Sequence, residues 1–119
     1  MAFDNAEAIR ELFSEVLPVT VRRMFGGHGV YADGIMFALE SDGEIFLKAD
    51  EQTIPSLEAE GSSRFVYPMR GREVSLPYWR LPERCYDEPD ELKSFVEAAV
   101  EVSRRAKRVQ KPAKKARRK

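Results

Sequence analysis

The spacing of apolar residues near the N-terminus predicts a short amphipathic helix. Asp4 and Glu7 have the spacing of a capping box at its start, and Pro18 ends it. Apolar side chains recur three and four positions apart, which places them on one helical face. They are Ile9, Leu12, Phe13 and Val16. The next segment, residues 19–25, is rich in β-branched residues and extended in character.

Turn signals divide the following residues into three strands. Residues 29–32 and 35–39 are separated by an Asp-Gly pair, and a second Asp-Gly pair precedes residues 44–48. Asp-Gly favours the positive φ angles of a type I′ turn, whose twist suits a two-residue hairpin. The pattern therefore predicts an antiparallel meander.

The second half of the chain predicts a short helix, two paired strands and a final helix. Residues 50–61 form the short helix, and residues 64–69 pair with 72–81 around Arg70-Gly71. Two prolines lie in these strands and cannot donate to a ladder, so at least one strand is an edge or carries a bulge. The final helix begins near Pro89 and presents a single apolar stripe. The stripe consists of Leu92, Phe95, Val96, Ala99 and Val102.

The predicted fold class is α+β, with two layers and the order α-β-β-β-α-β-β-α. An antiparallel sheet carries helices mainly on one face. A length of 119 residues is typical of one domain, and 43% hydrophobic residues suffice for a core. We expect a cytoplasmic protein, because there is one cysteine, no apolar leader and no run long enough to cross a membrane.

Charge is divided sharply along the chain, although the net charge is zero. Up to residue 103 there are ten basic and twenty acidic residues, a net charge of −10. Beyond it there are ten basic residues and no acid. These residues are Arg104, Arg105, Lys107, Arg108, Lys111, Lys114, Lys115, Arg117, Arg118 and Lys119. The division predicts a folded domain over 1–106 and a disordered basic tail over 107–119, since Pro112 breaks a continuing helix.

Several short motifs along the chain resemble the TfoX N-terminal domain family. The most specific is Met24-Phe25-Gly26-Gly27 with the hairpins that follow it, and the resemblance extends over about residues 8–105. It includes Phe46-Leu47-Lys48-Ala49-Asp50 and the Pro77-Tyr78-Trp79 segment. The resemblance implies a small two-layer domain similar to secretion chaperones and a role in competence or transcription regulation. It implies no catalytic residues.

The chemistry-bearing residues form no catalytic or metal-binding motif. The loop Gly26-Gly27-His28-Gly29 leads into a strand and lacks the lysine of a phosphate-binding loop, so we expect its glycines to serve backbone geometry. His28 has no partner by motif, and a pairing with Cys85 requires the tertiary structure. With one Cys and one His, a zinc cluster of these residues is excluded. We expect no enzyme activity, cofactor or small-molecule substrate.

Two surfaces are candidates for binding. The basic tail is suited to non-specific contact with DNA or RNA. A second surface combines arginines with an aromatic residue, a composition that suits phosphate contacts or a protein interface. It comprises Arg70, Arg72, Trp79, Arg80 and Arg84. The alternative function is a protein-interaction module that binds a partner or a second copy, because the acidic body repels phosphate.

Overall fold

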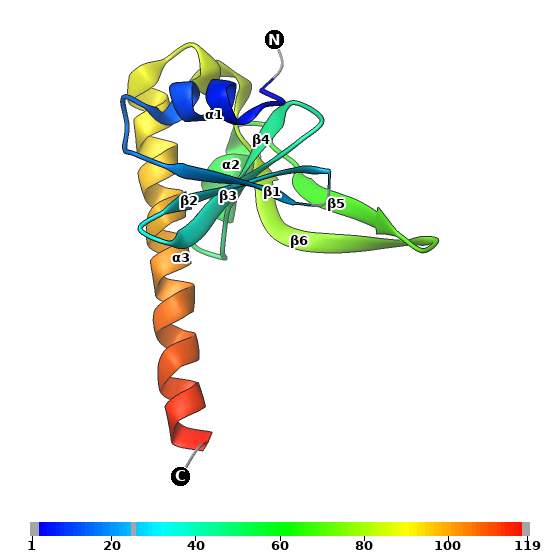
Figure 1. Cartoon of the computed structure of the whole chain (residues 1–119), viewed down its shortest axis with the longest axis vertical. Helices are drawn as coiled ribbons and strands as arrows, with labels where there is room; N and C mark the ends of the chain where they lie inside the picture. The colour runs from blue at the N-terminus through cyan, green and yellow to red at the C-terminus, as the bar shows by residue number, and fades with distance from the viewer. Residues whose placement is uncertain (1–2, 25, 118–119) are drawn as a thin grey trace.

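Six strands form one antiparallel sheet, and the helices pack on one of its faces (Figure 1). The computed structural model describes residues 3–24 and 26–117, with side chains placed as far as Lys107. The α+β, two-layer class predicted above is confirmed. The elements are α1 (Ala6–Phe13), β1 (Thr20–Met24), β2 (Gly27–Ala32), β3 (Ile35–Ser41), β4 (Glu44–Lys48), α2 (Ile54–Ala59), β5 (Arg64–Met69), β6 (Arg72–Arg80), the 3₁₀ helix η1 (Glu83–Tyr86) and α3 (Pro89–Arg117).

The hairpins follow the turn chemistry of the sequence. Asp33 and Gly34 have φ angles of 53° and 77°, and the second Asp-Gly pair repeats them at 53° and 81°. Both central residues of a type I′ turn need positive φ, which aspartate tolerates and glycine adopts freely. The extended segment after α1 is itself a strand, β1, and lies at one edge of the sheet, whose order is β1-β2-β3-β4-β6-β5. The other edge is β5, in agreement with its proline.

One face of the sheet is covered by α1 and α3. Its central side chains, including Phe37, Ile45 and Leu47, are fully buried or nearly so. Phe13 of α1 meets Phe37 edge-on, with ring centroids 5.5 Å apart. Val96 of α3 belongs to the same cluster. This cluster is the main core, and it is built from the apolar stripes that the helical spacing predicts.

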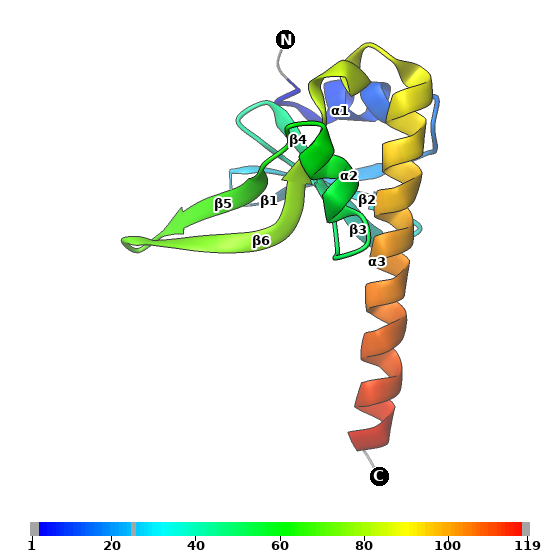
Figure 2. The same cartoon turned by 180° about the vertical axis from the view of Figure 1, so that it is seen from behind.

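The final helix is longer than the sequence predicts. It extends from Pro89 to Arg117 and continues through Pro112, where a break was expected, so that prediction is wrong. Proline removes one helical hydrogen bond, but alanine and lysine, which surround Pro112, are strong helix formers. Figures 1 and 2 show the end of α3 extending beyond the sheet. The domain boundary at 106 and the disorder of 107–119 stay predictions.

Candidate functional site

The face of the sheet opposite α1 and α3 is here called the open face. The β5–β6 hairpin projects on this side, away from α3 (Figure 1). Leu39, Phe46 and Tyr78 form a small buried cluster here. Phe65 of the hairpin packs against Phe46, with ring centroids 4.8 Å apart. Among the residues that the structure describes, no helix packs on this cluster, and Phe65 of the hairpin covers it.

A groove lies between the hairpin and the β1–β3 part of the sheet. Its volume is about 140 Å³. Its walls are largely apolar and come from both sides of the gap. The apolar residues are Met24, Leu39, Phe65, Tyr67, Met69, Val74 and Leu76. Met69 is 44% exposed, so an apolar side chain stands at the opening of the groove.

Two cations lie over two tyrosines on the same face. The Arg22 guanidinium is 5.4 Å from the centre of the Tyr31 ring, and the Lys48 ammonium is 5.5 Å from that of Tyr78. Burial, with a smaller contribution from Tyr31, raises the pKa of Tyr78 to about 12. Tyr78 therefore stays neutral, and the charges at this place are those of Arg22 and Lys48.

The glycines of the predicted family motif serve backbone geometry. Gly26 has a φ of +78°, and Gly27 packs so closely on the Glu40 carbonyl that a Cβ atom there would clash with it. Met24 lies beside the next strand, where its sulfur would meet a Cβ placed on Gly29. Phe25 lies outside the described residues. Open space surrounds Gly26, and a clash arises at Gly27, so the two glycines are needed for different reasons.

His28 has a partner that the sequence did not indicate. Its Nδ1 atom lies 2.7 Å from Glu40 Oε1, and Glu40 is 4% exposed. The other carboxylate oxygen accepts a hydrogen bond from the Gly43 backbone N–H at 2.7 Å. This arrangement satisfies a buried carboxylate and ties β2 to the β3–β4 turn. The pairing of residues 12 positions apart follows from the β2–β3 register, in which His28 lies opposite Glu40.

Cys85 lies in the core rather than beside His28. It is 1% exposed and belongs to the cluster of α1, α3 and the covered face of the sheet. Burial raises the pKa of its thiol to about 11. A thiol that stays protonated at neutral pH is a weak nucleophile, so Cys85 is suited to packing.

The predicted surface of arginines and Trp79 does not assemble. Trp79 is 8% exposed and packs against Ala49 and Leu57, and its Nε1–H has no hydrogen-bond partner among the described residues. Its placement on an outer surface is therefore wrong. Strand alternation in β6 places Trp79 on the covered face, opposite Leu47 of β4. There it packs against Leu57 of α2.

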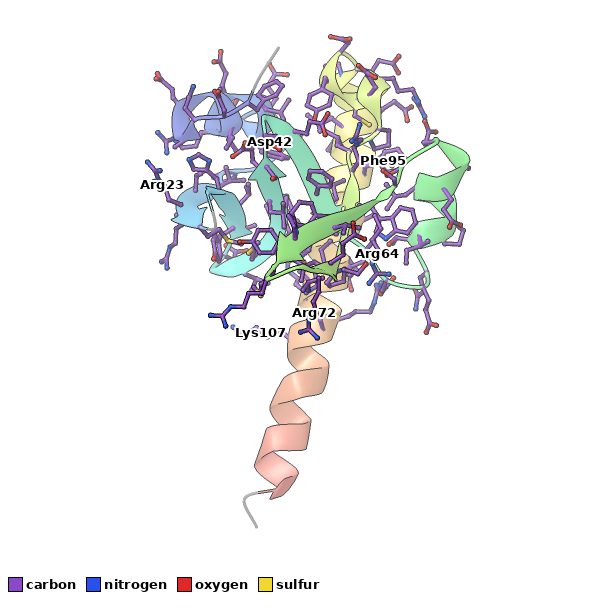
Figure 3. All side chains as sticks on the ribbon, turned by 90° about the vertical axis from the view of Figure 1, so that its right-hand side faces the viewer. Arg23, Asp42, Arg64, Arg72, Phe95 and Lys107 are labelled. Carbon is purple, nitrogen blue, oxygen red and sulfur yellow. The ribbon has the colours of Figure 1, made fainter. Side chains whose placement is uncertain are left out.

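The four arginines of that surface lie in three places: at Glu44, at a group of three carboxylates, and at the turn of the β5–β6 hairpin. Arg80 pairs with Glu44 at 3.1 Å. Arg84 contacts three carboxylates, those of Glu60, Glu88 and Glu91. Its hydrogen bonds to Glu60 lower the pKa of that carboxyl group. Arg70 and Arg72 flank the turn of the hairpin, and Figure 3 shows Arg72 at its end.

Comparison with known proteins agrees with the sequence motifs. The profile of the TfoX N-terminal domain matches residues 11–103. The chain belongs to the TfoX N-terminal domain family. It is 30% identical over 83 residues to DNA transformation protein TfoX1 of Aliivibrio fischeri (strain ATCC 700601 / ES114), which covers 70% of this chain and 40% of that protein. It is 30% identical over 77 residues to protein Sxy of Escherichia coli (strain K12), covering 65% and 37%.

The chain thus spans about two-fifths of the length of these two relatives. The match to the TfoX N-terminal domain includes the sheet, its open face and most of the contact between α3 and the sheet. It ends at residue 103, immediately before the ten basic residues.

The basic segment begins with two residues that are tied to the domain. Arg104 pairs with Asp33 at 3.2 Å, and Arg105 pairs with Asp50 at 2.8 Å. Lys107 is exposed. Figure 3 shows α3 continuing past it. The side chains of the later basic residues lie outside the described residues: Arg108, Lys111, Lys114, Lys115, Arg117, Arg118 and Lys119.

Two further observations concern metals and membranes. In the part of the chain that the structure describes, no three His, Cys, Asp or Glu side chains are grouped so as to hold a metal ion. No helix among the described residues has the length and apolar character needed to cross a membrane.

Proposed function

We propose that this chain is a non-enzymatic regulatory or accessory domain that acts in DNA transformation, with a basic C-terminal segment that contacts DNA or RNA without sequence preference. The printed name of the Aliivibrio fischeri relative, a DNA transformation protein, supports the process. The environments of Cys85 and His28 support a non-enzymatic role, because one is a buried, protonated thiol and the other is hydrogen-bonded to a buried carboxylate.

The course of α3 is the observation that carries the nucleic-acid proposal. Arg104 and Arg105 are the last described residues paired with acids of the domain. The helix continues for twelve more residues, to Arg117, which is about 18 Å at 1.5 Å per residue. The Debye length at physiological salt is about 8 Å, so the end of α3 is screened from the net charge of −10 on the domain.

Contact of this kind depends on charge and not on base recognition. The segment from 107 onward has eight basic residues and no aromatic side chain to stack on bases. Phosphate neutralisation releases counterions, so affinity falls steeply with salt. If about five cations touch duplex phosphates, log K against log salt has a slope of roughly −4 to −5.

An electrophoretic mobility shift tests this proposal with the full chain and with a chain truncated after Arg105. The truncation keeps the two arginines that pair with Asp33 and Asp50, so thermal stability should change little. We expect the full chain to shift a 30-base-pair duplex at 50 mM salt and to lose binding at 200 mM, and the truncated chain to give no shift.

A control variant tests whether binding depends on the basic C-terminal segment or only on the net charge of the whole chain. Arg10→Glu together with Lys93→Glu lowers the charge on the helical side of the domain and leaves the basic segment intact. Binding should persist in this variant. Equal binding by the truncated and full chains, or the absence of a shift at low salt, would show that the basic segment does not bind nucleic acid.

A second candidate function is binding of a protein partner through the open face of the sheet. The specific observation in its favour is the groove, which has an exposed methionine, Met69, in its lining and Arg72 opposite that methionine in the hairpin register. The two functions are compatible, because the groove and the basic segment belong to opposite sides of the sheet.

A further inference from the structure

The open face differs in charge from the rest of the domain. Alternation along paired strands places Arg22, Lys48, Arg72 and Arg80 on this face, together with the residues of the groove. Strand alternation places one carboxylate among the described strand residues on this face, that of Glu44, which pairs with Arg80. Glu40 also lines the groove, but it is 4% exposed and is bound to His28. The face therefore carries a net positive charge in a domain whose net charge is −10.

Two of these cations lie next to residues that line the groove. Arg22 is two residues from Met24 on β1, and Arg72 lies opposite Met69 in the hairpin register. Met24 and Met69 both line the groove. Methionine side chains adapt to partners of different shape, and an apolar cavity of about 150 Å³ holds a ring the size of benzene. A groove of 140 Å³ thus accepts one apolar side chain of a partner.

We infer that the open face binds an acidic amphipathic segment of a partner protein, with an apolar side chain in the groove and flanking carboxylates on Arg22, Lys48 and Arg72. This inference rests on the second function proposed above and specifies the chemistry of the partner. Charge complementarity of this kind directs association and excludes partners of the wrong charge.

The same features argue against two other occupants. A second copy that presented its own open face would bring like charges together, and one that presented its acidic side would form an open-ended chain of contacts. Nucleic acid would use the cations but not the apolar groove. Tyr78 is buried and Lys48 covers its ring, so this tyrosine is not free to stack on a base.

The test is selection of a random 12-residue peptide display library on the full chain at 150 mM salt, followed by affinity measurements on the enriched peptides. We expect peptides with an aromatic or large aliphatic residue between Asp or Glu residues. Both Arg22→Glu and Met69→Ala should weaken their binding at least about fivefold, which corresponds to about 1 kcal/mol.

The chain offers a matched control for each variant. Arg23 is the neighbour of Arg22 on the same strand but points to the other face, and Figure 3 shows it at the outer edge of the sheet. Val66 is 43% exposed, nearly the same as Met69, and lies on the opposite face of β5. Arg23→Glu and Val66→Ala should leave binding unchanged. All four variants retain the basic C-terminal segment. A loss of binding in Arg22→Glu and Met69→Ala alone therefore excludes attachment of the peptides to that segment.

The possible outcomes distinguish failure of this inference from failure of the proposed protein-binding function on which it rests. If acidic peptides are selected but Arg22→Glu and Met69→Ala bind them as wild type does, the site is wrong and protein binding stands. If no peptide is enriched, or the enriched peptides are basic, both the inferred site and the proposed protein-binding function are overturned. Sedimentation that shows self-association abolished by Arg22→Glu would assign the face to a second copy and overturn the inference.

Discussion

The two faces of the sheet are built from the same strands but have different roles. On the covered face, Phe37 and Ile45 have no exposed surface and contact helices on the other side. On the open face, Phe46 is 7% exposed and is covered by a hairpin, and Arg22 and Lys48 lie over tyrosines in place of a helix. The central side chains of the covered face have apolar partners from the helices, whereas the open face leaves a groove unfilled.

This difference indicates where stability and function reside. A face that is closed by two helices buries the apolar area that drives folding. A face that keeps cations and an open groove contributes less to folding and is available to bind. Substitutions at equivalent positions of the two faces should therefore differ in their effect on stability.

The largest difference is expected between neighbouring residues of β3. Phe37→Ala removes a fully buried ring from the covered face and should lower the free energy of unfolding by about 3–5 kcal/mol. Met36→Ala removes a partly buried side chain from the open face and should cost about 1 kcal/mol. Urea denaturation measures both. Equal costs would mean that the open face contributes as much to folding as the covered face.

The next effect concerns the close packing of β2 and β3. Gly27→Ala places a methyl group against the Glu40 carbonyl, so the backbone must shift, and we expect a loss of about 3 kcal/mol. In Gly26→Ala the added methyl group meets no neighbour, but the φ angle of +78° is unfavourable for alanine. We expect this variant to lose about 1 kcal/mol of unfolding free energy. Thermal or urea unfolding compares the two. A larger loss for Gly26→Ala would show that backbone conformation matters more than close approach at this corner.

The smallest effect is expected at the exposed ion pairs around Arg84. Its hydrogen bond to Glu60 lowers the pKa of that carboxyl group in the folded state. A lowered folded pKa stabilises the protein above the unfolded pKa, near 4.5, and this stabilisation is lost as the pH falls through the folded value. Glu60→Gln should thus reduce stability slightly at pH 7, by less than Gly26→Ala does.

The pH series for this pair uses urea midpoints of wild type and Glu60→Gln between pH 7 and pH 3.5. The two midpoints should converge as the pH falls. The variant Lys93→Gln removes a different exposed pair, that of Lys93 with Glu97, and serves as a control for the loss of one exposed charge pair at pH 7. A difference at Glu60 that is independent of pH would mean that packing, and not ionisation, connects it to Arg84.

Most of the fold was predictable from local patterns. The two Asp-Gly turns, the Arg70-Gly71 turn and the apolar stripes of α1 and α3 each appear where the sequence indicated, because turn geometry and helical periodicity depend on residues close together in the chain. The family motif was likewise visible. The continuation of α3 through Pro112 was not, because a helix tolerates one lost hydrogen bond when its neighbours favour helix.

The candidate site was much less predictable. The sequence indicated basic and aromatic residues between positions 70 and 84, but Trp79 is buried and Arg84 is held by three carboxylates. Glu40, the partner of His28, carried no signal at all. An alternating strand pattern says that two residues lie on opposite faces, but it does not say which face a helix will cover.

The sequence by itself determined most of the elements, their hairpin turns, the family and the division between an acidic domain and a basic C-terminal segment. Each of these depends on neighbours in the chain or on composition. Only the tertiary structure decided which face of the sheet stays open, that Met24 of β1 and Met69 of β5 line one groove, and that His28 faces Glu40. These contacts join residues far apart in sequence, and their existence depends on strand register and on which side of the sheet the helices pack.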